Sequence, residues 1–255
     1  MDVGRAWVTF FHNVPVEHRL LFNRELCGTT KEEKKQCWKR DLRRNKMNIK
    51  KDSRDFWDER YSQKDFFYGE EPNEYLKEKL KGLTPGEALF AAEGEGRNAV
   101  FAAKSGWKVL AFDQSEMGKT KAEVLAEKNG VQIDYIVSEV ETINYPESSC
   151  DLLVLVFAHF HANKRKAYHQ KLSAYLKEDG VLILEAFTKG QLHNQKQNPK
   201  AGGPKDVNML YDLEGIKSDF EGFEFVEAIQ TVTELNEGDF HTGKADVVRV
   251  VAIKK

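Results

Sequence analysis

The sequence predicts an α/β fold: a doubly wound, mainly parallel seven-stranded sheet with an antiparallel C-terminal hairpin. Short apolar runs alternate with helical segments at the spacing of βαβ units. The runs are largely apolar, as parallel strands are when helices cover both faces of a sheet. The last two strand-like runs follow each other without a helix, which is typical of an antiparallel hairpin.

The helices are predicted from apolar spacing and from residues that end a helix. Between Asn73 and Leu83, apolar side chains recur at helical spacing, and Pro85-Gly86 then breaks the helix. Gly106 and Gly130 end two further helices. The predicted helices are Asp55–Tyr61, Asn73–Leu83, Asn98–Lys104, Glu116–Asn129 and Lys164–Leu176.

The strands are predicted from short apolar runs bounded by turn residues. Asp151–Phe157 is the clearest, because it is apolar over almost its whole length. A Gly-Gly-Pro-Lys-Asp loop at residues 202–206 follows the fifth strand, where it could cover a substrate. The predicted strands are Ala88–Ala92, Lys108–Phe112, Gln132–Val137, Asp151–Phe157, Gly180–Phe187, Phe223–Glu234 and Asp246–Ile253.

Charge and pattern divide the chain after residue 46. Residues 1–56 hold fourteen Lys and Arg against eight Asp and Glu, and the remainder is acidic. Residues 1–46 are predicted to be a basic N-terminal extension, helical or disordered, and residues 47–255 the functional domain. The basic residues of the extension alternate with acids and polar residues, so we expect a solvated segment and no nucleic-acid partner.

Composition and cysteine usage indicate the compartment. The chain is 40% hydrophobic, which is enough for a packed core. No apolar run approaches the roughly 18–20 residues that span a bilayer, so no membrane partner is expected. The widely spaced cysteines Cys27, Cys37 and Cys150 form no CxxC pair, which is typical of a reducing compartment. We therefore expect a cytoplasmic protein.

A glycine-rich turn after the first predicted strand is the main candidate ligand site. It reads Glu93-Gly94-Glu95-Gly96-Arg97-Asn98. Glycine at positions 94 and 96 allows a tight turn and a close approach of backbone to a ligand. Asp113 ends the second strand, where a carboxylate can accept hydrogen bonds from a ribose diol. The pattern alone also fits a nicotinamide or flavin site.

The charge of the turn distinguishes these ligands. A dinucleotide places its pyrophosphate on the turn and on the helix N-terminus, where Glu93 and Glu95 would repel it by about a few kcal/mol. S-adenosylmethionine has no phosphate and carries an ammonium and a sulfonium, which an acidic turn attracts. Glu139, after the third strand, could meet the adenine amino group. The acids favour S-adenosylmethionine, and a nicotinamide-dependent oxidoreductase is the alternative.

Several segments occur in an order familiar from one enzyme family. Together they resemble a class I S-adenosylmethionine-dependent methyltransferase, and more narrowly the tellurite-resistance/thiopurine methyltransferase-like group, over residues 50–255. The resemblance implies a Rossmann-like fold and transfer of a methyl group from S-adenosylmethionine. The segments are Phe56–Tyr61, Tyr68–Asn73, Glu93–Asn98, Asp113–Ser115, Asp151–Phe157 and Leu176–Gly180.

The glycine turn departs from the usual Asp-x-Gly-x-Gly-x-Gly pattern of the family. Ala91-Ala92 stand near the position of the first glycine, and Glu93 is the only acid just before Gly94. Glu93 is therefore expected to contact the methionine ammonium in a different way from the acid of the usual family pattern.

The resemblance implies a set of cofactor-binding residues. Asp113 would bind the ribose, while Glu139 and Val140 would flank the adenine. Ser115 is also a suitable N-cap for the helix that follows it. The implied cofactor-binding residues are Glu93, Gly94, Gly96, Arg97, Asn98, Asp113, Gln114, Ser115, Glu139, Val140 and Phe157.

The candidates on the substrate side are aromatic and acidic. Trp57, Tyr61 and Tyr68 belong to an aromatic-rich segment that could form a lid, exclude water and favour a cation. An aromatic cluster at helical spacing is also consistent with core packing. Glu185 lies in an apolar strand. It is expected to be either a buried acid beside the substrate or a hydrogen-bond partner of loop backbone.

The histidines are the candidates for a catalytic base. His159 and His161 lie two apart after the fourth strand, so their side chains are expected to face the same way. They have no third ligand nearby, so no metal site is expected. His159 is the candidate base and His241 is predicted to be a turn residue.

Methyl transfer to a small molecule is the expected reaction. The expected acceptor is a thiol, chalcogen or other soft nucleophile. A thiolate or a reduced chalcogen anion needs little or no base, whereas a hydroxyl or amine needs one. The sequence Phe157-Ala158-His159-Phe160 lacks the Asn/Asp-Pro-Pro-aromatic pattern that holds a flipped adenine, which argues against a nucleic-acid substrate. A cofactor-sensing module without enzymatic activity would have the same fold.

Overall fold

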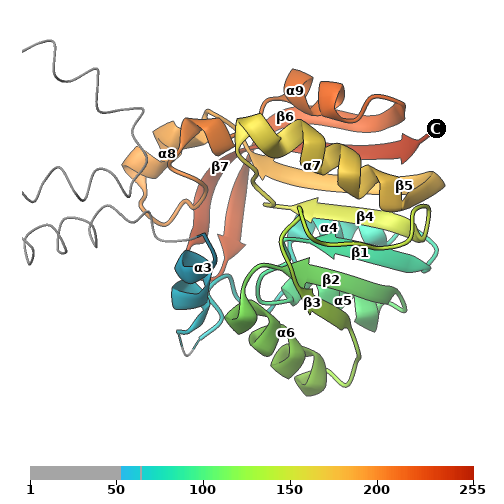
Figure 1. Ribbon diagram of the computed structural model, residues 1–255. Helices are drawn as coiled ribbons and strands as arrows, with labels where there is room; N and C mark the ends of the chain where they lie inside the picture. The colour runs from blue at the N-terminus through green and yellow to red at the C-terminus, as the bar shows by residue number, and fades with distance from the viewer. Residues whose placement is uncertain (1–52, 64) are drawn as a thin grey trace, which may run out of the picture. The chain divides into compact units, whose positions relative to one another are not determined.

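Among the described residues, seven strands form one sheet, as predicted, and their order in the sheet is β3-β2-β1-β4-β5-β7-β6. The computed structural model describes residues 53–63 and 65–255 (Figure 1). Strands β1 to β5 are parallel to one another. They span Glu87–Ala91 (β1), Lys108–Asp113 (β2), Asp134–Val137 (β3), Cys150–Val156 (β4) and Leu176–Phe187 (β5).

The C-terminal hairpin consists of β6 (Phe223–Glu237) and β7 (His241–Lys254). Strand β7 runs antiparallel to β5 along Val181–Phe187, and β6 pairs only with β7, so β6 forms the edge of the sheet. The predicted hairpin is therefore confirmed, and both strands are longer than predicted. Their turn lies at the end of the sheet where the parallel strands have their carboxyl ends.

Helices cover both faces of the sheet because successive side chains of a strand point to opposite faces. Phe90 and Val154 are buried on the face covered by α4 (Glu74–Leu80), α5 (Arg97–Lys104) and α6 (Glu116–Lys128). Leu89 and Leu155 are buried on the face covered by α7 (Ala162–Tyr175) and α9 (Leu213–Asp219). Both faces therefore form hydrophobic cores, as the apolar runs predict.

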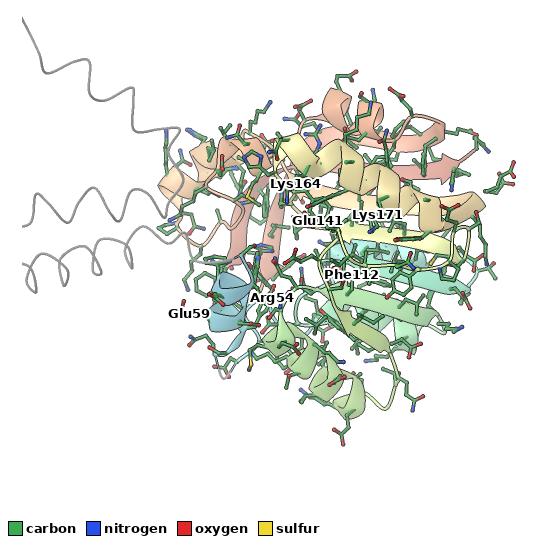
Figure 2. The ribbon with its side chains drawn as sticks, viewed as in Figure 1. Arg54, Glu59, Phe112, Glu141, Lys164 and Lys171 are labelled. Carbon is green, nitrogen blue, oxygen red and sulfur yellow. The ribbon has the colours of Figure 1, made fainter. Side chains whose placement is uncertain are left out.

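Surface ion pairs join the helical layers to the loops. Figure 2 shows Glu141, in the segment between β3 and β4, beside two lysines of α7. Lys164 donates to the Glu141 carboxylate at 2.6 Å and Lys171 to its carbonyl at 2.8 Å. The same figure shows α3 (Ser53–Tyr61), which carries Arg54 and Glu59.

Short polar segments differ from the sequence prediction. Helix α8 (Gln191–Gln197), the 3-10 helix η2 (Val207–Met209) and helix α9 are not predicted. They are too short to show apolar periodicity, and α9 starts where Asp212 accepts a hydrogen bond from the Gly215 amide at 2.8 Å. Strand β5 begins at Leu176, where the sequence predicts the end of a helix.

Some sequence predictions lie outside the described residues. These are the extension at residues 1–46 and the cysteines Cys27 and Cys37, whereas Cys150 is a buried free thiol. None of the helices in residues 53–63 and 65–255 has the length and apolarity needed to span a bilayer.

Candidate functional site

The order of the strands indicates where a ligand can bind. In open α/β sheets, ligands bind at the carboxyl ends of the strands, at the point where the strand order reverses. Here β1 has β2 on one side and β4 on the other, so the reversal lies between β1 and β4. The glycine turn follows β1 and Phe157 follows β4. The two segments singled out by sequence therefore meet at this point.

The backbone is left-handed at two positions of the glycine turn and at Ala92, just before it. Gly94 has φ +63°, Gly96 has φ +86° and Ala92 has φ +53°. Ala92 stands near the position where the usual family pattern has a glycine, and its φ is uncommon for a residue with a side chain. The turn is covered by aromatic residues: Tyr135 donates its hydroxyl to the Gly94 carbonyl at 2.6 Å, and a Cβ on Gly94 would lie 2.6 Å from the Tyr61 hydroxyl oxygen.

Gly96 serves packing within the protein. A Cβ on Gly96 would lie 2.4 Å from the Cβ and 2.8 Å from the Cα of Ala122 in α6. The missing side chain thus lets the start of α5 approach α6. A larger residue here would therefore separate two helices as well as fill the turn.

Glu93 caps the N-terminus of α5. Its Oε1 accepts hydrogen bonds from the amides of Asn98 at 2.9 Å and Ala99 at 2.8 Å. Burial raises the pKa of Glu93 to about 7, against the opposing effect of these amides and of Arg97. A carboxylate of the protein therefore occupies the helix N-terminus that would bind a pyrophosphate in a dinucleotide site.

Glu95 is paired within the protein. It pairs with Lys121 of α6 at 2.7 Å and accepts the amides of Phe67 at 2.8 Å and Tyr68 at 3.4 Å. Its side chain is only 3% exposed. The expectation that Glu95 adds a free negative charge to the site is wrong, because Lys121 neutralises it.

Asp113 ends β2 beside the glycine turn, as predicted. Its two oxygens accept the Gly94 amide at 3.2 Å and the Ser115 amide at 2.9 Å. Burial raises the pKa of Asp113 to about 6, although these amides oppose the rise. Ser115 is the N-cap of α6, where it accepts the Gly118 amide at 2.9 Å. Gln114 donates to the Ser53 hydroxyl at 3.1 Å.

The segment after β3 contacts the start of α3. Glu139 is partly buried and Arg54 of α3 lies 3.6 Å from it. Val140 is buried in the hydrophobic core. The Asp58 carboxylate of α3 accepts a hydrogen bond from the Ser115 hydroxyl at 2.6 Å. Helix α3 is therefore tied to the chain just after β2 and just after β3.

The aromatic segment folds over the glycine turn. Trp57 stacks on Tyr61 at 5.4 Å between ring centroids. The Arg60 guanidinium lies 5.0 Å from the Trp57 ring and 4.7 Å from the Phe67 ring, and donates to the Tyr68 hydroxyl at 2.9 Å. The predicted lid residues thus lie together at the candidate site.

A buried polar network fixes the other side of the turn. Arg97 pairs with Glu237 at 2.6 Å, and Asn98 accepts the Asn73 amide at 2.9 Å. Glu185 is completely buried and accepts hydrogen bonds from Arg249 at 2.6 Å and the Asn73 side chain at 2.5 Å. Arg97, Asn98 and Glu185 therefore make contacts within the protein that hold the turn, the hairpin and α4 together.

His159 and His161 do not form the pair expected from the sequence. Strand β4 ends at Val156, so the two histidines lie in the following loop. His159 Nδ1 lies 2.7 Å from the Met209 carbonyl and Nε2 accepts the Phe187 amide at 3.2 Å. Burial lowers the pKa of His159 to about 4. Both nitrogens therefore have backbone partners, while His161 is the exposed N-cap of α7.

The backbone of Phe157, two residues before His159, is strained. It has φ +53°, which is rare for a bulky residue, and such strain is concentrated at functional sites. Its ring stacks on Phe187 at 4.5 Å.

His241 is the functional candidate that the sequence analysis misses. Predicted as a turn residue, it is 5% exposed and lies 3.4 Å from Glu237, which also binds Arg97. Its only sequence signal is the spacing of four residues from Glu237 across a hairpin turn.

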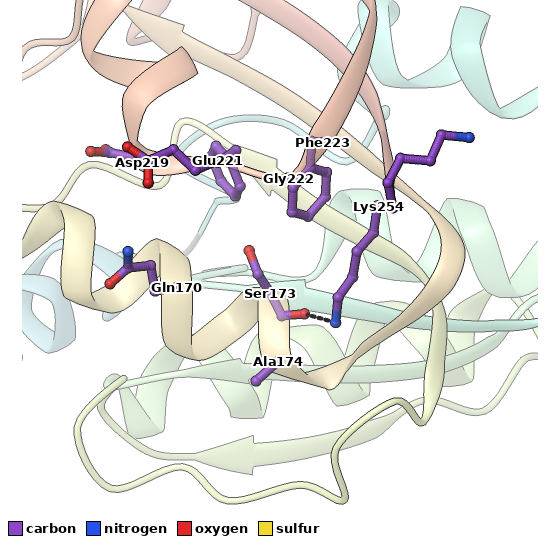
Figure 3. A pocket seen from close by; sticks show the side chains of 10 residues that line it. Gln170, Ser173, Ala174, Asp219, Glu221, Gly222, Phe223 and Lys254 are labelled. Carbon is purple, nitrogen blue, oxygen red and sulfur yellow. Dashed lines mark hydrogen bonds between the residues drawn. The ribbon is translucent and has the colours of Figure 1, made fainter.

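Cavities lie at two further places among the described residues. One of about 350 Å³ lies between residues 68–75 and the end of β6. Figure 3 shows another, of about 250 Å³, between α7, the turn before β6 and the C-terminus. There Lys254 donates to the Ser173 carbonyl at 2.8 Å. In residues 53–63 and 65–255, no three His, Cys, Asp or Glu side chains are grouped as a metal site requires.

The comparisons with known proteins agree with this geometry. Residues 89–184 match the family model of a methyltransferase domain. The match begins in β1 and ends in β5, so the domain includes the glycine turn, Asp113 and Phe157. Together with the sheet topology, the methyltransferase domain indicates S-adenosylmethionine as the cofactor, as predicted. The comparison with curated proteins found no match.

Solved structures resemble the methyltransferase domain and its surroundings. TehB from Haemophilus influenzae has a TM-score of 0.59 and 16% identity, with 79% of this chain and 67% of that chain covered. Magnesium protoporphyrin IX methyltransferase (ChlM) from Synechocystis PCC 6803, with bound SAH, has a TM-score of 0.55 and 15% identity, over 71% and 82%. At these identities the likeness establishes the Rossmann-like fold.

Proposed function

We propose that this chain transfers a methyl group from S-adenosylmethionine to a small-molecule acceptor, a thiol, chalcogen or other soft nucleophile. The proposal places it near the tellurite-resistance/thiopurine methyltransferase-like group and in the reducing cytoplasm, where thiol acceptors persist. The observation that carries the choice of cofactor is the cap of α5. Glu93 fills the helix N-terminus that a dinucleotide pyrophosphate needs, so a nicotinamide cofactor would have to displace it.

The residues at the carboxyl ends of β1 to β4 fit the parts of S-adenosylmethionine. Asp113 offers carboxylate oxygens to ribose hydroxyls, and Glu93 offers a negative charge to the methionine ammonium. Trp57 and Tyr61 offer aromatic surface to a cation and exclude water. S-adenosylmethionine supplies a methyl group that is already activated, so the protein mainly has to orient the acceptor, which can supply up to about 7–11 kcal/mol of the barrier.

Ligand-dependent stabilisation tests the proposal. S-adenosylhomocysteine at a hundredfold excess over its dissociation constant is expected to stabilise the folded protein by about 2.7 kcal/mol. NADH at the same concentration is expected to leave the unfolding temperature unchanged. Stabilisation by NADH and none by S-adenosylhomocysteine would favour the oxidoreductase instead.

Asp113→Asn is expected to weaken S-adenosylhomocysteine binding by about 10- to 100-fold, because hydrogen bonds to a charged group contribute about 1.5–3 kcal/mol. Isothermal titration calorimetry measures the affinity, and circular dichroism checks that the variant is folded. Asp134→Asn, an exposed position on β3, is the matched control and should bind normally. Equal affinities of the two variants would mean that the ribose does not bind at Asp113.

The affinity for S-adenosylhomocysteine is expected to rise with pH. The pKa of Asp113 is raised to about 6 and that of Glu93 to about 7. Both must therefore lose protons before Glu93 can pair with the ligand's ammonium and Asp113 can accept from its ribose hydroxyls as a carboxylate. Between pH 5.5 and 7.5 the association constant should therefore increase by up to about a hundredfold, with release of protons. Calorimetry in two buffers of different ionisation enthalpy measures that release. Glu93→Gln should confine the rise to the range near pH 6, and a flat profile in the wild type would contradict the assignment.

A further inference from the structure

We propose that His241 is the base that removes a proton from the acceptor, and that the acceptor is a thiol bound in its neutral form. This inference rests on the proposed function and adds to it a residue and a protonation state. It starts from the arrangement of Glu237 and His241 on either side of the β6–β7 turn.

Glu237 orients the imidazole of His241. The Glu237 carboxylate lies 3.4 Å from Nδ1 of His241, a long hydrogen bond that can shorten when the ring becomes charged. Glu237 is held in place by Arg97 at 2.6 Å and by the Asn73 side chain at 2.9 Å. Although burial acts to raise the pKa of Glu237, Arg97 and His241 hold it at about 2. An ionised Glu237 accepts the Nδ1 proton, which leaves the lone pair of His241 on Nε2.

Nε2 of His241 is free to accept a proton. Among the described residues it has no hydrogen-bond partner, and it is not completely enclosed by protein atoms. The ring lies against Gly202, where a Cβ would come within 2.3 Å of it. His159 differs in this respect, because both of its nitrogens are engaged by backbone groups.

The surroundings of His241 connect it to the candidate site. Its ring lies 4.6 Å from that of Phe157, the strained residue after β4, and 4.4 Å from that of Tyr68 in the aromatic segment. Arg97, the residue after the glycine turn, holds its partner Glu237. Tyr68 and Glu237 also line the cavity of about 350 Å³, whose volume lies in the range of small-ligand pockets. An acceptor in that cavity would lie beside Tyr68 and Glu237, which both contact the His241 ring.

The electrostatics favour a neutral acceptor. The charged and titratable groups that act on His241 are Glu237 of β6, Arg97 of α5, Arg60 of α3, Tyr68 and His159. Burial lowers the pKa of His241, although Glu237 opposes this, so the ring is neutral and able to accept a proton at neutral pH. The walls contributed by Phe157 and Phe187 are apolar and would not compensate the desolvation of an oxyanion.

The reaction balances with a thiol as acceptor. The S–H bond breaks and its proton passes to Nε2 of His241. The sulfur electron pair of the acceptor forms the new bond to the methyl carbon. The bond from that carbon to the donor sulfur breaks, and its electron pair stays on that sulfur. The proton on His241, stabilised by Glu237, is then released to solvent.

Two thiols that differ in acidity test the assignment. Benzyl mercaptan is mostly protonated at pH 7.5, whereas 4-nitrothiophenol is already a thiolate and needs no base. His241→Asn keeps a donor toward Glu237 and removes Nε2. It is expected to lower kcat with benzyl mercaptan at least about 100-fold, the usual contribution of general base catalysis, and to leave 4-nitrothiophenol within about threefold of the wild-type value. His193→Gln, an exposed histidine of α8, should change neither.

A second readout does not depend on turnover. Long-range 1H–15N spectra of the protein are expected to show His241 protonated at Nδ1 and unprotonated at Nε2. A proton on Nε2, equal losses with both thiols, or a wild-type protein that binds S-adenosylhomocysteine but methylates neither thiol would overturn the inference. Failure of the wild type to bind S-adenosylhomocysteine would instead refute the proposed function. His241→Gln serves as a replacement if His241→Asn does not fold.

Discussion

Glu185→Ala is expected to lower the free energy of unfolding by about 3–5 kcal/mol, because it leaves the Arg249 charge buried without its main partner. Glu185 is fully buried, and the Arg249 side chain is 21% exposed. The Arg249 guanidinium also lies 4.8 Å from the Tyr75 ring and donates weakly to Thr233, and these contacts cannot replace a carboxylate. Urea unfolding followed by circular dichroism measures the loss.

Two comparisons distinguish the effect of breaking the buried ion pair from the effect of removing a carboxylate side chain. Glu224→Ala removes a carboxylate that pairs with Lys255 at 3.1 Å on the surface, and should cost no more than about 1 kcal/mol. The double variant Glu185→Leu with Arg249→Met removes both charges and should recover most of the stability. A Glu185→Ala variant as stable as Glu224→Ala would show that the pair does not hold the hairpin to β5.

Gly96→Ala is expected to destabilise the protein by about 3 kcal/mol or more. Overpacking of this kind costs about 1–3 kcal/mol, and a side chain in the left-handed region adds about 1–2 kcal/mol. Both apply, since φ is +86° and the new Cβ would lie 2.4 Å from the Ala122 Cβ. The helices α5 and α6 would have to separate at the turn, so S-adenosylhomocysteine binding should weaken as well.

Gly130→Ala is the matched control for the cost of placing alanine in a left-handed backbone conformation. Gly130 has φ +67°, and a Cβ there would meet nothing within 4 Å. Its cost should therefore be only the left-handed penalty of about 1–2 kcal/mol, and thermal unfolding measures the difference between the two variants. If the two alanine variants unfold at the same temperature, the contact of Gly96 with Ala122 is not significant.

Local pattern was sufficient to predict the sheet and its ligand edge. Asp151–Phe157 is apolar because both faces of β4 are covered. Asp113 is the polar residue at which the apolar strand β2 ends. Ser115 caps α6 through a contact only three residues away. Such features depend on neighbours in the chain, so their position in the sequence is enough to identify them.

Side-chain partners in the site could not be predicted in the same way. Glu93 and Glu95 are separated by one residue, yet Glu93 caps α5 whereas Glu95 pairs with Lys121 of α6. No local pattern distinguishes the two carboxylates, because their difference depends on which helix packs against each one.

The sequence by itself determined the seven strands along the chain, the helices between the parallel strands, the glycine turn and the acid at the end of β2. Only the tertiary structure decided which charges face a ligand and which residues meet across the site. Arg97 and Glu237 are 140 residues apart in the chain, and they meet because β7 inserts beside β5 and carries the hairpin turn to the carboxyl end of the sheet. That insertion depends on pairing between distant strands, which local residue patterns do not specify.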